Sequence, residues 1–212
     1  MLKNKLHLVL ASASPRRKEL LGHLNIPFEI IALNVPEDSN QEDPRLFSLD
    51  VALLKSEAVV AKLAKEREKE NQFVVSADTI VYLNGRIFGK PKDTAEAREF
   101  LRILSGKTHS VFTAVSFQLR YNGEVFSHRF AEETKVTFSE ISDILLEHYL
   151  KSGDSLDKAG AYGIQNGSLA FIPKVEGDYA NVVGFPLSRF VMEAEKFLKS
   201  HFPQEASWFN LF

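Results

Sequence analysis

The stretch FVVSADTIVYLNGRIF, Phe73–Phe88, decides how the middle of the chain folds. Phe73–Ala77 is a short apolar run, which is typical of a strand that is buried on both faces. Asn84-Gly85 separates Thr79–Leu83 from Arg86–Phe88, and this dipeptide favours the type I′ turn that joins two antiparallel strands. The stretch therefore predicts a buried strand followed by a β-hairpin.

Outside this stretch, segments with helical and strand-like apolar patterns alternate along the chain. A second Asn-Gly turn, within Tyr121-Asn122-Gly123, predicts another long hairpin. Alternating strands and helices with two added hairpins predict an α/β protein with a mixed β-sheet. The predicted helices are Pro15–Leu24, Leu46–Lys69, Asp93–Leu104, Ile141–Leu150 and Leu187–Phe202. The other predicted strands are Leu6–Ala11, Phe28–Leu33, Ser110–Arg120, Val125–Phe138, Leu169–Val175 and Tyr179–Val183.

Length and composition limit the class of protein. A chain of 212 residues suits one domain or two lobes that share a cleft. The net charge of −2, from 26 basic and 28 acidic residues, argues against nucleic acid as a partner. The absence of cysteine excludes disulfides and thiolate metal sites, and it fits a cytoplasmic location.

The N-terminal segment imitates a secretory signal, with lysines, an apolar run and Ala11-Ser12-Ala13. Its apolar run, Leu6–Ala11, is shorter than the roughly 7–15 residues of a signal core, so we interpret it as a buried strand. Nothing in the sequence approaches the ~20 consecutive apolar residues of a membrane span, and no membrane partner is expected.

The segment Ser12–Arg17 places two cations where a helix favours anions. Ser14 is a good N-cap and Pro15 suits the first helical position. Arg16 and Arg17 then fall in the first turn, where the helix dipole is already positive. A strand followed by a helix N-terminus and two guanidinium forks predicts a phosphate-binding site. The alternative is an exposed helix start with two solvated arginines.

Three further polar clusters interrupt the regular pattern. Asp78 ends an apolar run, where a carboxylate can bind Mg²⁺ or position a water, although a turn-forming Asp is common. Pro91 favours an extended conformation at Lys90, whose ammonium can reach a ligand from a loop. Gln165 lies in the glycine-rich DKAGAYGIQNG, and its amide can both donate to and accept from a base edge. Each loop could instead be a simple connector.

Four of these motifs stand in an order that resembles one known family. They are Ser12-x-Ser14-Pro15-Arg16-Arg17, Ala77-Asp78-Thr79, Gly89-Lys90-Pro91 and Lys158-Ala159-Gly160-Ala161-Tyr162-Gly163-Ile164-Gln165. Together they look like the Maf family of nucleoside triphosphate pyrophosphatases, with a resemblance that runs from about Leu6 to Leu187. The resemblance implies one Maf/ITPase-like domain over residues 1–212, elongated and two-lobed, with a mixed sheet and a central active-site cleft.

The resemblance also implies a reaction. Water attacks between the α and β phosphates of a nucleoside triphosphate, giving the monophosphate and pyrophosphate, with Mg²⁺ or Mn²⁺ as cofactor. The subfamily that this chain resembles best prefers dTTP and UTP, and its markers are Arg16, Thr79 and Gln165. These three residues are carried over as base-selecting positions. A homodimer is suggested by the same analogy.

The remaining roles come from the same resemblance. Asp78 is carried over as the proton acceptor and, with Glu37, as a metal ligand. Lys55 and Lys90 match family positions around the phosphates, and Arg17 joins them as a catalytic cation. The substrate-binding residues expected beside these are Ser12, Ser14, Arg16, Thr79 and Gln165.

Two other functions stay open from the sequence. The same fold could act on purine or non-standard nucleoside triphosphates, as the wider ITPase-like group does. A nucleotide-binding regulator, for instance one linked to cell division, would retain the triphosphate without releasing pyrophosphate.

Overall fold

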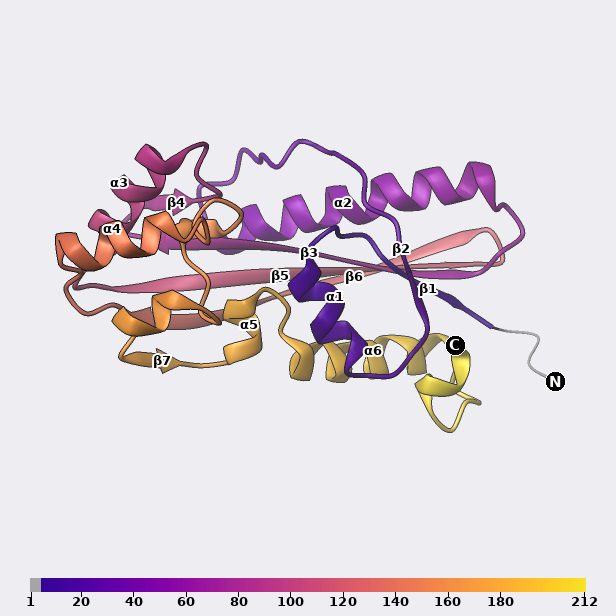
Figure 1. Cartoon of the computed structure of the whole chain (residues 1–212). Coiled ribbons are helices and arrows are strands. Elements are labelled where there is room, and N and C mark those ends of the chain that lie inside the picture. The colour runs from indigo at the N-terminus through magenta and orange to yellow at the C-terminus, as the bar shows by residue number, and fades with distance from the viewer. Residues whose placement is uncertain (1–4) are drawn as a thin grey trace. The chain divides into compact units, whose positions relative to one another are not determined.

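The structure of the protein is a computed structural model that describes residues 5–212 (Figure 1). Its helices are α1 Pro15–Gly22, α2 Pro44–Glu66, α3 Thr94–Leu104, α4 Asp143–Lys151, α5 Tyr179–Val183 and α6 Leu187–His201. Its strands are β1 His7–Leu10, β2 Phe28–Ile30, β3 Gln72–Leu83, β4 Arg86–Phe88, β5 Thr108–Tyr121, β6 Glu124–Thr137 and β7 Lys174–Glu176. Three short 3₁₀ helices complete the described chain: η1 Ala159–Ala161, η2 Gly167–Phe171 and η3 Trp208–Leu211.

The described strands form one seven-stranded sheet in the order β2-β1-β3-β5-β6-β7, with β4 paired to β3. β1 is parallel to both of its neighbours, β2 and β3. Leu8 lies opposite Phe28 of β2 on one side and Phe73 of β3 on the other. The β3–β4 and β6–β7 pairs are antiparallel. The predicted α/β class with a mixed sheet is therefore confirmed. None of the helices described in residues 5–212 combines the length and apolar character of a membrane span.

Both predicted Asn-Gly turns are present. Asn84 and Gly85 have φ angles of 49° and 85°, and Asn122 and Gly123 have φ angles of 51° and 86°. A type I′ turn needs a positive φ at both central residues, which Asn and Gly tolerate best. These turns fix the β3–β4 and β5–β6 connections that the sequence predicted.

The chain divides into two compact units. Among the described residues, the first contains 5–78, 114–131 and 185–212, and the second contains 79–113 and 132–184. Three of the boundaries fall inside strands, at Asp78 in β3, Thr113 in β5 and Ala131 in β6. The predicted active-site cleft stays a prediction.

In the first unit, β3 is covered on both faces, as its apolar sequence predicted. Phe73, Val75 and Ala77 belong to an apolar cluster that also contains residues of α1 and α6. Val74 belongs instead to a cluster with Val59 and other residues of α2. Because successive side chains of a strand point to opposite faces, odd residues of β3 face one helical layer and even residues the other. Figure 1 shows α2 on one side of these strands and α6 on the other.

The C-terminal tail packs on the first unit. Trp208 and Leu211 are buried in the same cluster as Phe73, and the ring of Phe212 lies 6.1 Å from that of Phe73. The Leu6 amide donates to the Leu211 carbonyl at 2.7 Å. Trp208, Leu211 and Phe212 are therefore part of the core that supports β3.

The second unit contains the two strand predictions that the structure contradicts. The segment predicted as a strand at Leu169–Val175 is η2, followed by the short strand β7. Tyr179–Val183, also predicted as a strand, is helix α5, because Asp178 caps it through the Ala180 amide and Gly184 ends it at a φ of 120°. A five-residue apolar run does not distinguish a strand from a buried helical turn. Smaller differences lie at element ends: β2 stops at Ile30, and α2 begins at Pro44 behind the cap Asp43.

Candidate active site

The packing of β3 against α2 brings Lys55 to Asp78. The even-numbered face of β3 presents Val74, Ser76 and Asp78 to α2, and Lys55 lies on the α2 face that packs there. Lys55 Nζ donates to Asp78 Oδ1 at 2.7 Å. The Lys55 side chain is 12% exposed and that of Asp78 is 8% exposed, so water screens this ion pair little.

Small residues allow α2 to approach the sheet closely below this ion pair. Ser76 Oγ donates to the Ala52 carbonyl at 2.6 Å, and the hydroxyls of Ser56 and Ser116 lie 3.0 Å apart. Ala52 also packs against Ala114 of β5. All of these side chains are buried, and each hydroxyl has a partner. The close contact fixes the turn of α2 from which Lys55 extends.

A second carboxylate reaches the same ammonium group. Glu37, in the loop before α2, lies 2.8 Å from Lys55 Nζ through its Oε1 atom. Its side chain is 46% exposed, whereas Asp78 is buried. Lys55 therefore joins one buried and one accessible carboxylate.

Arg17 belongs to the same group. Its Nη1 donates to Ser12 Oγ at 3.2 Å, and Ser12 is buried between β1 and α1. Burial lowers the pKa of Arg17 from its ordinary value, the carboxylates of Asp78 and Glu37 oppose that shift, and neighbouring Arg16 adds to it. Two of the arginine's electrostatic neighbours are thus the carboxylates that bond Lys55.

The structure corrects the predicted cap of α1. Ser14 occupies the N-cap position and Pro15 begins the helix, as expected, but the Ser14 side chain makes no capping hydrogen bond. The Ser14 amide instead donates to Ser12 Oγ at 3.3 Å. Ser12 Oγ therefore accepts from both Ser14 and Arg17, and it ties the helix start to the guanidinium. No acidic residue occupies the first turn of α1.

In the second unit, Thr79 is held by a chain of hydrogen bonds. The hydroxyls of Thr79 and Thr113 lie 3.0 Å apart, and Thr113 donates its own proton to the Asn181 carbonyl at 2.8 Å. Since Thr113 has one proton, Thr79 is the donor in its pair with Thr113. Asn181 is fully buried and is fixed by Thr134, whose hydroxyl accepts from Asn181 Nδ2 at 3.0 Å.

The second unit also brings Lys90 and the glycine-rich loop together. The Gly160 amide donates to the Gly89 carbonyl at 3.0 Å, so the backbone before Lys90 is hydrogen-bonded to the loop. Gly160 has a φ of 68°, and a Cβ there would collide with Val81 of β3. Lys90 and Gln165 are both exposed, one on each of these neighbouring segments.

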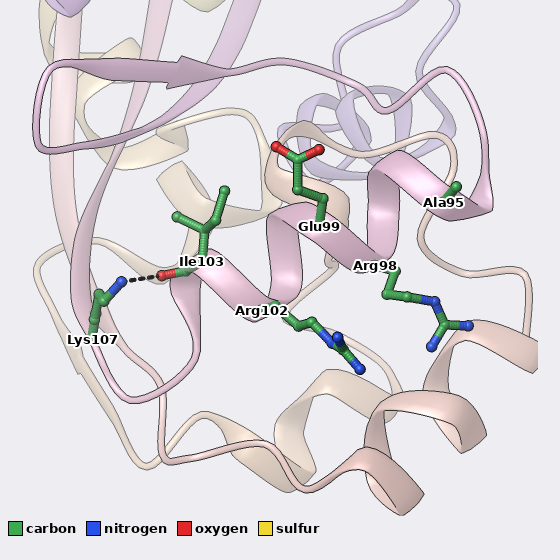
Figure 2. Close-up of a pocket in the computed structure, with 6 residues that line it drawn as sticks. All are labelled: Ala95, Arg98, Glu99, Arg102, Ile103 and Lys107. Atoms are coloured by element: carbon green, nitrogen blue, oxygen red, sulfur yellow. Dashed lines mark hydrogen bonds between the residues drawn. The ribbon is translucent and has the colours of Figure 1, made fainter.

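The second unit also has a surface hollow that lies apart from the predicted site residues. It is lined by residues of α3 and the turn after it: Ala95, Arg98, Glu99, Arg102, Ile103 and Lys107 (Figure 2). Its cations are bonded already: Arg98 to Glu147, Arg102 to Asp143 at 3.1 Å, and Lys107 to the Ile103 carbonyl at 2.7 Å. The hollow contains none of the predicted site residues.

Comparison with known proteins identifies the family to which this chain belongs. The family model described as Maf-like protein matches residues 7–197. The chain belongs to the Maf family. It is 44% identical over 180 residues to a dTTP/UTP pyrophosphatase of Deinococcus radiodurans, covering 85% of this chain and 87% of the relative. Proteins of the same name from Bacillus cytotoxicus and Thermosipho africanus are 42% and 41% identical, covering 89% and 86% of this chain and 94% and 88% of each relative.

The carboxylates of this Maf chain fit one kind of metal site. Within residues 5–212 no three His, Cys, Asp or Glu side chains form a cluster that could cage an ion. Mg²⁺ is commonly held by one or two carboxylates together with substrate phosphates and water. Asp78 and Glu37, which converge on one ammonium, supply that pair. The donor set therefore suits an ion that arrives with a triphosphate.

Several residues around the predicted Maf site were not found from the sequence. Thr113, which accepts a hydrogen bond from Thr79, lies 34 positions from it and carries no local motif. Ser56 and Ser116 are single buried serines without a sequence signal. The ion pair between Asp154 and Lys158 has a sequence signal, because an acidic residue stands four positions before a lysine.

Proposed function

We propose that the chain is a dTTP/UTP pyrophosphatase, which hydrolyses these nucleoside triphosphates to the monophosphate and pyrophosphate. Relatives that carry this name are 41–44% identical and span at least 85% of the chain. The three residues that mark base preference in the resemblance, Arg16, Thr79 and Gln165, are all present.

The observation that carries the proposal is the pairing of Lys55 with two carboxylates. Lys55 bonds Asp78 at 2.7 Å and Glu37 at 2.8 Å, and Arg17 is under the electrostatic influence of both. Two cations and two carboxylates balance one another. A triphosphate adds about four negative charges. Further cations are then required, and Arg16, Lys90 and a divalent ion would supply them.

Each residue of this group has a distinct part in hydrolysis. Asp78 orients the attacking water and accepts its proton as oxygen bonds to the α phosphorus. The bond from the α phosphorus to the bridging oxygen breaks, and pyrophosphate leaves with that oxygen. Lys55 fixes the Asp78 carboxylate by a charge-assisted hydrogen bond. Arg17, anchored on Ser12, stabilises charge on the phosphate oxygens.

A divalent cation is part of the proposal. Asp78 and Glu37 would hold Mg²⁺ or Mn²⁺, whose charge polarises the phosphate oxygens and offsets their repulsion from the carboxylates. Lys55 keeps both carboxylates within reach by bonding one oxygen of each. Ser12 and Ser14 are proposed to bind the substrate from the β1–α1 connection. A cytoplasmic location and a homodimer complete the proposal, the first in agreement with a cysteine-free chain.

A pyrophosphate-release assay tests the proposal. The substrates are dTTP, UTP, CTP, ITP, ATP and GTP, each with Mg²⁺ and with Mn²⁺. Release from dTTP and UTP above the others is expected. Release from ITP or GTP instead would favour the purine alternative and contradict the roles of Thr79 and Gln165. Tight nucleotide binding without pyrophosphate would contradict an enzyme and favour a regulator.

A further inference from the structure

The loop that carries Gln165 is bonded to a half-buried carboxylate, Asp154. This residue follows α4, and its side chain is 15% exposed. Asp154 Oδ1 accepts from Lys158 Nζ at 2.8 Å and from Asn166 Nδ2 at 2.7 Å. Asp154 Oδ2 accepts from the Tyr149 hydroxyl at 3.1 Å. One carboxylate therefore binds three donors from the helix and the loop.

Tyr149 extends this network to the loop backbone. Its hydroxyl donates to Asp154 and accepts from the Gly163 amide at 3.3 Å. Burial, followed by the negative charge of Asp154, raises the pKa of Tyr149, so the phenol keeps the proton that it donates. The Gly163 carbonyl in turn accepts from Ser168 Oγ at 2.6 Å. Gly163 is thus fixed at both its amide and its carbonyl.

Lys158 fills the space beside Gly163. Its side chain is 8% exposed, and its ammonium donates to Asp154 Oδ1, to the Asp154 carbonyl at 2.7 Å and to Asp157 Oδ1 at 2.5 Å. A Cβ at Gly163 would collide with the Lys158 stem. The absence of a side chain at Gly163 therefore lets the lysine and the loop pack together.

Gln165 lies between two residues that depend on Asp154. Gly163 is connected to Asp154 through the Tyr149 hydroxyl, and Asn166 donates to Asp154 directly. Ile164 is 2% exposed, whereas Gln165 is exposed. The backbone on both sides of Gln165 is held while its own amide group faces outward from the core. Such pre-organisation is what a base-selecting amide requires.

We propose that Asp154 is a positioning residue for base selection, which holds the Gln165 loop through Tyr149, Lys158 and Asn166. This deepens the proposed function, and its activity readout rests on that function. Asp154 acts through other residues and does not touch the substrate. The conformation of the loop before substrate arrives is the property that Asp154 controls.

Amide hydrogen exchange of the nucleotide-free protein tests the positioning without reference to activity. The Gly163 amide is expected to exchange about tenfold faster or more in Asp154→Asn and Tyr149→Phe. Asp157→Asn is the control, because Asp157 bonds the same ammonium, through its Oδ1 atom, without being Asp154. Unchanged exchange at Gly163 in Tyr149→Phe, or equal acceleration in the control, would overturn the proposal.

The ratio of kcat/KM for UTP to that for CTP tests the link to base selection. Asp154→Asn, Tyr149→Phe and Asn166→Ala are expected to lower this ratio roughly tenfold, and Asp154→Glu to recover part of it. Asn166 is exposed, so its variant stays informative if Asp154→Asn fails to fold. If the Gly163 amide exchanges faster in Asn166→Ala while the UTP-to-CTP ratio of kcat/KM is unchanged, the role of Asp154 in base selection is overturned. A wild-type protein that releases no pyrophosphate would contradict the proposed function, while the exchange experiment would still decide whether Asp154 anchors the loop.

Discussion

Lys55 of α2 and Asp78 of β3 are bonded at 2.7 Å although 23 positions separate them in the chain. Strand alternation determines this pairing, because Val74, Ser76 and Asp78 share the face of β3 that packs on α2. Glu37 joins the same ammonium from a loop. The resemblance assigns Lys55, Asp78 and Glu37 to the phosphates and the metal. The packing of α2 on β3 in the core of the first unit holds Lys55 and Asp78 together.

Replacement of Arg17 by Met should impair turnover more than stability. The guanidinium lies desolvated in the first turn of α1, against the helix dipole, so its loss removes an unfavourable burial together with its attraction to two carboxylates. We expect kcat for dTTP to fall roughly 100-fold with a melting temperature that is unchanged or higher. Lys18→Met, which removes an exposed cation from the next position, is the control. A large loss of melting temperature without ligand would argue that Arg17 is structural.

Replacement of Thr113 by Val should weaken base selection. Thr113 donates to the Asn181 carbonyl and therefore accepts a hydrogen bond from Thr79, so the Thr79 oxygen acts as an acceptor toward any other group. Such an acceptor suits the N3–H donor of uracil and thymine, whereas N3 of cytosine is itself an acceptor. We expect the kcat/KM ratio of UTP to CTP to fall about tenfold. Thr108→Val, which breaks the exposed pair with Thr137 on the same strand, should leave the ratio unchanged.

Acid should destabilise the protein through His109. Burial lowers the pKa of His109 from 6.5 to about 4, so the folded protein holds the neutral imidazole. Between these values the unfolded chain binds more protons, and stability therefore falls as the pH decreases from about 6.5 toward 4. The loss amounts to about 3 kcal/mol over the whole interval. His109→Gln should flatten this part of the curve of unfolding free energy against pH. An equally steep curve in the variant would assign the acid sensitivity to other groups.

Replacement of Arg120 by Met should lower stability in the first unit. This buried guanidinium donates to the carbonyls of Arg67, Glu68 and Glu70, just after α2 ends, and to Gln72 Oε1. Its loss removes one donor from each of these three carbonyls and from Gln72 Oε1. We expect a cost of about 2–4 kcal/mol in unfolding free energy, measured by denaturant titration. Arg129→Met, at an exposed arginine paired with Asp50, should cost less than about 1 kcal/mol. Equal losses would contradict the role given to the buried carbonyl contacts.

The regular parts of the fold could be predicted from the sequence because local signals determine them. The two Asn-Gly turns and the apolar run of β3 each carry such a signal. Asp93 carries another, because its side chain caps α3 by accepting from the Glu96 amide. Tyr179–Val183 was predicted wrongly because a short apolar run suits either element, and the cap Asp178 decided for a helix.

The site could be predicted only in part. The motif residues were found, but their contacts depend on packing between distant elements, as with Ser12 and Arg17 or Lys55 and Asp78. The supporting residues Thr113 and Tyr149 could not be found, since a buried hydroxyl has no sequence pattern that reveals its partner. The sequence predicted a phosphate-binding site at Arg16 and Arg17, and it did not reveal that Asp78 and Glu37 act on Arg17.

The most direct test of the central claim is pyrophosphate release from dTTP by the wild type and by Asp78→Asn. Nucleotide binding is measured on both proteins, and Asp50→Asn serves as the control, since Asp50 pairs with an exposed arginine. We predict release by the wild type and the control, and a loss of roughly 10²–10⁴-fold in Asp78→Asn with binding retained. Turnover by Asp78→Asn at the wild-type rate would contradict the assignment of Asp78 as the proton acceptor.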